Sequence, residues 1–135
     1  MNNYAIGQLA TAAGVGIDTV RYYERSGLLQ PAARSTSGYR KYSDVELNRL
    51  NFIRGAQHLG FSLSEIGELL AISSRRDVAA MHKAASARLA DIDKRIGELQ
   101  RMRTALSNLI SECPAEGPAA NCPILRALMN KEALS

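Results

Sequence analysis

The sequence predicts a chain that is almost entirely helical, and two features of the whole chain lead to this fold class. Ala, Leu, Arg and Glu recur throughout, whereas only 5% of the residues are aromatic and none is Trp, a composition that favours helices. Apolar residues also recur at helical spacing along most of the chain. A length of 135 residues with 46% hydrophobic content supports one modest core with an appended element.

The segment AIGQLATAAGVGIDTVRYYERSGLL, residues 5–29, predicts two short helices joined by a tight turn at Gly14. Apolar residues repeat at helical spacing on both sides of this turn: Ile6, Leu9, Ala10 and Ala13 before it, Ile17, Val20 and Tyr22 or Tyr23 after it. This is a helix-turn-helix pattern, whose second helix enters the major groove of DNA. Candidates for the outer face of that helix are Asp18, Thr19, Arg21 and Tyr22. The alternative is a generic helical hairpin.

The next segment, PAARSTSGYRKYS, interleaves basic residues with tyrosines. Arg34, Arg40 and Lys41 stand with Tyr39 and Tyr42 around a Ser/Gly turn, and such a wing can set cations and phenols against phosphates. Residues 1–60 carry seven Lys/Arg and four Asp/Glu, whereas residues 61–135 carry ten and nine. The amino-terminal part is therefore the basic part, which favours a nucleic acid partner, although an excess this mild also fits an ordinary solvated surface.

Residues 44–72 predict two further helices that close the core behind the wing, the first beginning at Ser43 or Asp44. Their apolar faces are Val45, Leu47, Leu50, Ile53 and Ala56 on the first helix, and Leu63, Ile66, Leu69 and Leu70 on the second. His58 is interpreted as structural or solvent-facing, because no other His or Cys is near it in sequence. Residues 1–72 are thus predicted to form a winged helix-turn-helix DNA-binding domain.

A longer apolar stripe follows in residues 75–112. Its positions alternate in steps of four and three, and eight of the ten are apolar: Val78, His82, Ala85, Leu89, Ile92, Ile96, Leu99, Arg103, Leu106 and Ile110. A single helix cannot bury such a stripe against itself, so the pattern predicts a coiled-coil dimerisation helix. The alternative is that the stripe packs back onto residues 44–72.

Residues 113–135 contain the only two cysteines, each followed by proline. A residue before proline is pushed out of helical conformation, so Cys113 and Cys122 are predicted at loop ends. Pro123 suits the first turn of a short helix, ILRALMN, whose partial positive charge stabilises a thiolate at Cys122. The loop PAEGPAAN is small and nearly free of donors, which suits a soft metal ion held by two thiolates. A redox pair and two inert thiols are the alternatives.

The start, MNNYAIGQLA, lacks the basic region and apolar run of a signal peptide, and no stretch of about 18 apolar residues is present to cross a bilayer. We therefore expect a cytoplasmic protein with no membrane partner. In a reducing cytoplasm, two isolated cysteines favour ligands or redox-active thiols over a structural disulfide. An enzyme is not expected, because the chain shows no strand–turn–helix nucleophile motif and no CxxC.

With these segments in this order, the chain resembles the MerR family of transcriptional regulators. The matching stretches are IGQLATAAGVGIDTVRYYERSGLL, RSTSGYRKYS and DVELNRLNFIRGAQHLGFSLSEIGELL, and the match continues to about residue 130. The resemblance implies a homodimer with an antiparallel pair of dimer helices, which binds double-stranded promoter DNA and distorts it so that RNA polymerase engages. It also implies DNA contacts by Arg21, Tyr23, Arg34, Tyr39 and Arg40, to which the helix and wing patterns add Thr19 and Lys41.

Metal-sensing members of this family carry a cysteine pair in the corresponding loop, which supports Cys113 and Cys122 as ligands. Members that sense divalent ions typically have a third cysteine at the start of the dimer helix, where this chain has Val78. Two thiolates alone favour linear coordination, the preference of monovalent copper, silver and gold ions and also of mercuric ions. We therefore expect a monovalent ion, and the resemblance is nearest to the copper-efflux regulators. That subgroup usually has serine at position 78 and a loop one residue shorter.

Two alternatives to a monovalent ion stay open. The first is a divalent ion (mercury, zinc, cadmium or lead). Zinc, cadmium and lead want ligands beyond the two thiolates, and His82 is the candidate, although His82 is also interpreted as a tolerated polar residue in the dimer seam. A redox-responsive regulator would use the two thiols as a reversible disulfide.

Overall fold

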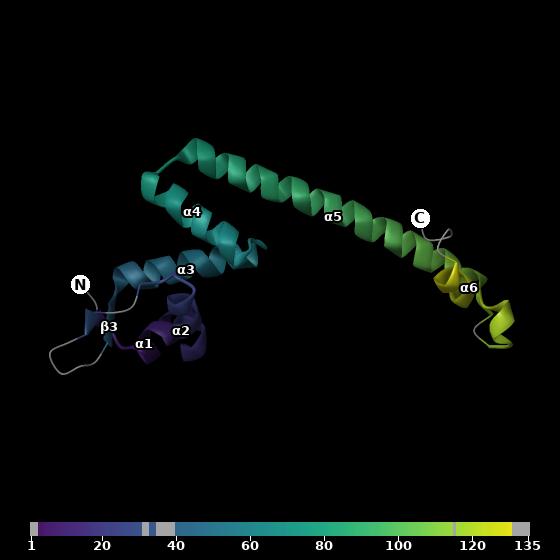
Figure 1. Ribbon diagram of the computed structural model, residues 1–135, viewed down its shortest axis with the longest axis horizontal. Helices are drawn as coiled ribbons and strands as arrows, with labels where there is room; N and C mark the ends of the chain where they lie inside the picture. The colour runs from purple at the N-terminus through teal and green to yellow at the C-terminus, as the bar shows by residue number, and fades with distance from the viewer. Residues whose placement is uncertain (1–2, 31–32, 35–39, 115, 131–135) are drawn as a thin grey trace. The chain divides into compact units, whose positions relative to one another are not determined.

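The computed structural model describes residues 3–30, 33–34, 40–114 and 116–130. The chain divides into two compact units, Met1–Ala84 and Ala85–Ser135. Most of the described residues are helical (Figure 1), and the predicted mainly helical fold is confirmed. The domain boundaries drawn from the sequence at residues 72, 75 and 112 stay predictions.

The first unit contains the predicted helix pair, α1 (Ile6–Ala13) and α2 (Ile17–Arg25). The turn between them requires glycine at position 14, where φ is 71°. A Cβ added there would also lie only 3.1 Å from Nη1 of Arg54. The left-handed backbone conformation therefore favours glycine at this position, and a larger residue would also displace the end of the Arg54 side chain by a few tenths of an ångström.

A small antiparallel sheet forms the wing. It has the order β1-β3-β2, with β1 (Asn3–Tyr4), β2 (Ala33–Arg34) and β3 (Arg40–Ser43). Tyr4 pairs with Tyr42, and Arg34 pairs with Arg40. The sequence did not predict β1, because two residues are too short to show alternation and the strand exists only through its pairing with β3.

Two longer helices close the core behind the wing, α3 (Asp44–His58) and α4 (Leu63–Arg75). Both begin with a capping box, in which Ser43 pairs with Glu46 and Ser62 pairs with Glu65. The buried core draws on α1 to α4 and on β3, and its fully buried large side chains are Leu9, Val20, Leu29, Tyr42, Leu50, Ile53 and Ile66.

One predicted core position on α3 is wrong. Val45 is 68% exposed and lies in the first turn of α3, before the part of the helix that packs in the core. Leu50, Ile53 and Ala56 are buried as predicted.

Two arginines of α3 hold the helix-turn-helix in place. Nε of Arg49 donates to the carbonyl of Leu28 at 2.5 Å, and Nη1 of Arg54 donates to the carbonyl of Ala13 at 2.6 Å. Each guanidinium satisfies a carbonyl at or just after the end of a short helix, where no intrahelical partner is available. The orientation of α1 and α2 is therefore fixed by polar contacts as well as by the core.

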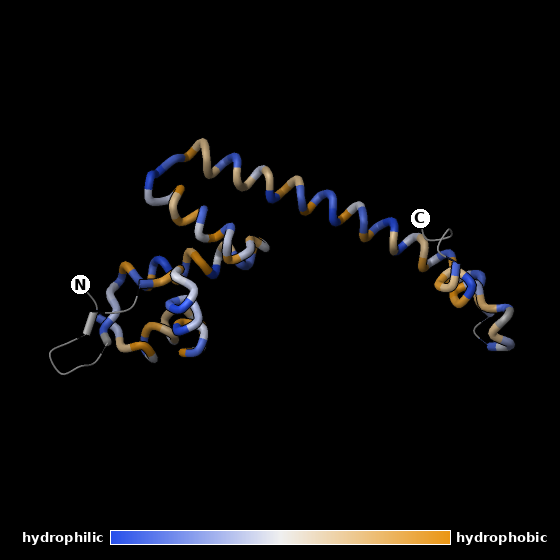
Figure 2. Tube along the Cα trace, in the orientation of Figure 1, coloured by the Kyte–Doolittle hydropathy of each residue, from blue (hydrophilic) through white to orange (hydrophobic). Residues whose placement is uncertain are grey.

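α5 (Val78–Glu112) spans 35 residues and has no buried residue. Apolar positions recur along it at regular intervals, separated by hydrophilic ones (Figure 2). Its exposed large apolar side chains are Val78, Leu89, Ile96, Leu99, Met102, Leu106 and Ile110. Six of these seven belong to the stripe predicted from the sequence, and Met102 is the addition.

The chain ends in a loop that contains the 3-10 turn η1 (Ala119–Asn121), followed by the short helix α6 (Pro123–Met129). α5 stops one residue before Cys113, and Pro123 is the first residue of α6, as the two Cys-Pro pairs predicted. Among the described residues, none of the helices combines the length and the apolar character needed to cross a membrane.

Candidate DNA-binding surface and thiol loop

The exposed face of α2 carries the candidates for base contacts. Arg21 and Asp18 are exposed, Thr19 is half-buried and Tyr22 is 46% exposed. Val20 and Tyr23 face the core from the opposite side. The helix therefore offers one polar face to solvent, as a recognition helix must.

Tyr23 does not lie on that face. Its side chain is only 3% exposed, and its hydroxyl donates to Oε1 of Gln57 on α3 at 2.5 Å. The structure thus gives Tyr23 a packing role, which argues against the predicted DNA contact of its side chain. Tyr22, whose ring centroid lies 5.9 Å from that of Tyr23, is the tyrosine that reaches solvent.

The wing residues lie on β2 and β3. The backbone pairing of Arg34 with Arg40 brings two predicted DNA contacts to adjacent strands. Lys41 is exposed, whereas Tyr42 is fully buried and its hydroxyl donates to the carboxylate of Glu24 on α2. Tyr39 lies outside the described residues. The Tyr42–Glu24 hydrogen bond ties the base of the wing to the candidate recognition helix.

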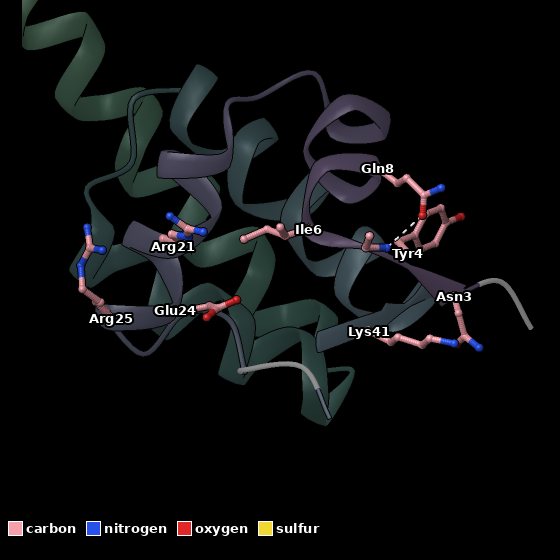
Figure 3. Close-up of a pocket in the computed structure, with 9 residues that line it drawn as sticks. Asn3, Tyr4, Ile6, Gln8, Arg21, Glu24, Arg25 and Lys41 are labelled. Atoms are coloured by element: carbon pink, nitrogen blue, oxygen red, sulfur yellow. Dashed lines mark hydrogen bonds between the residues drawn. The ribbon is translucent and has the colours of Figure 1, made fainter. Parts of the chain in front are cut away.

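An open groove of about 770 Å³ is lined by α2, by the strands and by the start of α1. Figure 3 shows Arg21, Glu24 and Arg25 extending from α2, with Lys41 on β3 and Asn3 on β1 across from them. The sequence identified Arg21 and Lys41 as candidates but not Arg25 or Asn3. The spacing of Arg21 and Arg25, one helical turn apart, was the available indication that both lie on the same face.

The two cysteines lie together in the second unit. Sγ of Cys113 is 4.0 Å from Sγ of Cys122, and both thiols are free and half-buried. Cys113 directly follows α5, and Cys122 directly precedes α6. The helix boundaries at the two Cys-Pro pairs thus place the two thiols at the two ends of one loop.

The surroundings of Cys122 favour its thiolate. Hydrogen bonds from the backbone amide of Leu125, and to a smaller extent that of Ile124, lower the pKa of the Cys122 thiol. The neighbouring thiol of Cys113 and the charge of Arg126 act in the same direction, while partial desolvation opposes them. A thiolate is the form of cysteine that binds metal ions.

The thiols line a pocket of about 230 Å³ whose other walls include Pro114, Pro118 and Leu125. Within the described ranges, no group of three or more His, Cys, Asp and Glu side chains could hold a metal ion. Val78 is 80% exposed and His82 is exposed, both in the other unit. Glu116 also lines this pocket, but it does not form with the two thiols a group that could hold a metal ion. The metal-ligand set that the described part of one chain offers at this loop is therefore two sulfurs.

This donor set fits a thiophilic ion. Two sulfurs that bind one ion at about 2.3 Å each are about 3.8 Å apart in a tetrahedral site and about 4.6 Å apart in a linear one. The observed separation of 4.0 Å lies between these values. One ion can therefore bridge the pair after the sulfurs approach by about 0.2 Å for a tetrahedral site or separate by about 0.6 Å for a linear one.

Comparison with known proteins identifies the relatives of this chain. The family described as MerR HTH family regulatory protein matches residues 4–72, and the family described as MerR, DNA binding matches residues 47–109. A mercuric resistance operon regulatory protein from Shigella flexneri is 35% identical over 135 residues, covering 100% of this chain and 94% of the relative. The HTH-type transcriptional regulator CueR of Salmonella typhimurium is 38% identical over 122 residues, covering 89% of this chain and 88% of that protein.

The chain also resembles a solved structure of a transcription regulator. The transcription regulator PbrR691 from Ralstonia metallidurans CH34, in complex with lead(II), superposes with a TM-score of 0.79. The two sequences are 33% identical, and the alignment covers 91% of this chain and 97% of that chain.

A helix-turn-helix with a wing, followed by a long helix and a thiol loop, defines the class of ligand-responsive transcriptional regulators. Within that class, the chain belongs to the MerR family of helix-turn-helix regulatory proteins. The relatives are regulators of transcription and not enzymes, as the sequence led us to expect. The recognition made from the helix-turn-helix, the wing and the helices that follow is confirmed.

Proposed function

We propose that this chain is a cytoplasmic, homodimeric activator of transcription that responds to a soft metal ion held by Cys113 and Cys122. The observation that carries this proposal is the thiol pair itself, with its sulfurs 4.0 Å apart at the mouth of a small pocket. The lowered pKa of Cys122 supports a metal-binding role, because it increases the fraction of the thiol present as thiolate.

The ion that best suits two sulfur donors is monovalent copper, silver or gold. Soft monovalent ions are satisfied by two thiolates, whereas zinc, cadmium and lead require additional ligands. Position 78, where divalent-sensing relatives typically supply a third thiol, is Val78 in this chain. The donor count therefore favours a monovalent ion.

Mercuric ion is the second candidate. It also accepts two thiolates in a linear arrangement. The Shigella flexneri relative, 35% identical over the whole chain, is a mercuric resistance regulator. The number of sulfur donors thus favours a monovalent ion, whereas the similarity to a mercuric resistance regulator favours mercuric ion. Activation assays with a series of metal ions distinguish the two.

Promoter DNA is the proposed macromolecular partner, together with RNA polymerase at the promoter. In the proposed complex, α2 enters the major groove and directs Arg21, Tyr22 and Thr19 toward base edges or phosphates. The wing contributes Arg34, Tyr39, Arg40 and Lys41 along the backbone. Since the Tyr23 side chain is buried, it is not part of the proposed interface.

We propose that α5 packs against α5 of a second copy of the chain. Its apolar stripe includes Leu89, Ile96, Leu99, Leu106 and Ile110, all exposed in the single chain. An antiparallel pair of such helices buries the stripe along the helix length. The homodimer also matches the two half-sites of a pseudo-palindromic operator.

The test is in vitro transcription from the chain's own promoter across a metal panel under anaerobic conditions. Wild-type protein is expected to activate with cuprous, silver or gold ions, and Cys113→Ser and Cys122→Ser to bind the operator but give no activation. A response to mercuric ion alone would show that the protein senses mercury and not a monovalent ion. Activation by oxidant without metal would instead establish a thiol-redox regulator, with a disulfide between the two cysteines.

A further inference from the structure

We propose that Arg49 and Arg54 of α3 are positioning residues for sequence reading, which hold α2 at the angle at which its side chains meet base edges. This inference rests on the proposed DNA binding and deepens it, since neither arginine belongs to α2 or to the wing. Their long side chains reach from α3 to the chain on either side of α2. The two contacts therefore lie where they can set both ends of that helix.

The first contact holds the chain just before α2. Nη1 of Arg54 donates to the carbonyl of Ala13, the last residue of α1, at 2.6 Å. Carbonyls in the last turn of a helix have no intrahelical partner, and the helix dipole favours a cation there. A Cβ built on Gly14 would lie 3.1 Å from the same nitrogen, so the guanidinium lies against the turn itself. The turn that leads into α2 is thus held by a side chain of α3.

The second contact holds the chain just after α2. Nε of the half-buried Arg49 donates to the carbonyl of Leu28 at 2.5 Å. The amide of Leu28 in turn donates to the carbonyl of Tyr23 on α2 at 3.0 Å, so Leu28 is tied to the end of that helix. Both ends of α2 are therefore linked to α3 through main-chain carbonyls and guanidinium groups.

These hydrogen bonds add a directional restraint that the apolar core does not supply. Val20 of α2 shares the core with Leu50 and Ile53 of α3, but apolar contact is non-directional and tolerates small rotations of one helix on another. A hydrogen bond weakens as its donor angle departs from linear, so two of them at the ends of α2 resist such a rotation. Hydrogen bonds to base edges need the same precision, whereas contacts to phosphates carry no sequence information.

The experiment compares the affinity of the full-length protein for its operator with that for an unrelated duplex, each over a range of salt concentrations. Arg54→Met keeps the apolar stem and removes the donor. We expect operator affinity to fall about tenfold, the effect of losing one base contact. Affinity for the unrelated duplex should stay within about twofold of wild type, and the salt slope should not change, because no phosphate contact is lost. Arg49→Met should act in the same direction and is an independent test.

Two control variants separate positioning from a simple effect of charge. Arg54→Lys keeps a cation that can donate to a carbonyl, and it should restore most of the preference for the operator. Arg101→Met, at an exposed position of α5 in the other unit, makes the same change in net charge and should bind both duplexes as wild type does.

The outcomes that oppose the proposal are distinct. A salt slope that falls by about two per dimer, with weaker binding to both duplexes, would make the arginine a phosphate contact instead. Variants that lower only the thermal unfolding midpoint, and keep the wild-type preference for the operator while folded, would show a structural role alone. A wild-type protein that does not prefer its operator to the unrelated duplex would overturn the proposed function itself.

Discussion

At the residue scale, the two adjacent tyrosines of α2 have different roles. Tyr22 is 46% exposed and Tyr23 is 3% exposed, because consecutive residues on a helix point about 100° apart. The hydroxyl of Tyr23 reaches Gln57 on α3. Tyr23 therefore links the recognition helix to the helix behind it, and Tyr22 is available to a partner.

Tyr23→Phe removes that link without changing the volume of the core. We expect the free energy of unfolding to fall by about 1 kcal/mol, the net value of one hydrogen bond. Operator affinity should stay within twofold of wild type, as measured by fluorescence anisotropy. Tyr22→Phe is the matched control and should leave stability unchanged. If Tyr23→Phe lowers the affinity for DNA but leaves stability unchanged, the result would support the direct DNA contact of Tyr23 that the family resemblance implies.

The thiol of Cys122 gives a second prediction at this scale. Backbone amides of Leu125 and Ile124 donate to its sulfur, so its pKa lies below that of an ordinary cysteine. A lowered pKa means that the thiolate persists as the pH falls below about 8.5, the usual value for cysteine. The rate at which iodoacetamide alkylates the metal-free Cys113→Ser variant should therefore rise with pH. The midpoint pH of this rise should be lower in the folded variant than in the same variant in denaturant. Equal midpoints in the two conditions would contradict the prediction.

At the scale of elements, α5 differs from the helices of the first unit. α1 to α4 each bury residues in a common core, whereas α5 has none buried. The ion pairs of Asp91 with Arg88 and Arg95, at 2.8 and 3.1 Å, support the helix on its surface but add little stability. An exposed apolar stripe along such a helix requires a partner.

Replacing Leu89 and Ile96 together by glutamate tests this requirement. Both side chains are exposed in the single chain, so the change should not disturb the core of the first unit. We expect monomers in sedimentation equilibrium, because like charges would face each other where apolar side chains meet in the dimer. Asp93→Lys with Lys94→Glu, outside the stripe, should remain dimeric. A dimer that persists in the double glutamate variant would show that α5 does not form the interface.

At the scale of the whole molecule, the proposed DNA-binding and metal-binding residues lie in different units. The candidate DNA-binding residues fall in Met1–Ala84, and both cysteines fall in Ala85–Ser135. Val78 is the first residue of α5 and Cys113 directly follows the last. Since the two ends of a helix cannot meet, a side chain at position 78 reaches the thiols only from another copy of the chain.

Val78→Cys uses this separation to test both the dimer and the ion. A third thiolate from the partner subunit should raise the affinity for zinc or cadmium at least tenfold, measured by competition with a chelator. Val78→Ser adds a polar group without a thiolate and should keep the wild-type preference. Since Val78 is 80% exposed, neither change should affect folding. Identical zinc affinities in the two variants would contradict a site shared between subunits.

The sequence by itself determined most of the elements and the position of the thiol pair. Periodicity predicted α1 to α5, and the capping serine Ser43 marked the start of α3. The two prolines marked the end of α5 before Cys113 and the start of α6 after Cys122. These features depend on residues within a few positions of each other, so local preference is sufficient to predict them.

Only the tertiary structure decided which residues meet. It buried Tyr23 and exposed Val45, created β1 by pairing Tyr4 with Tyr42, and set the 4.0 Å between the two sulfurs. It also made Asn3 and Lys41 part of the lining of one groove with Arg21 and Arg25. Each of these results depends on contacts between segments far apart in the chain, and no local pattern of residues encodes such contacts.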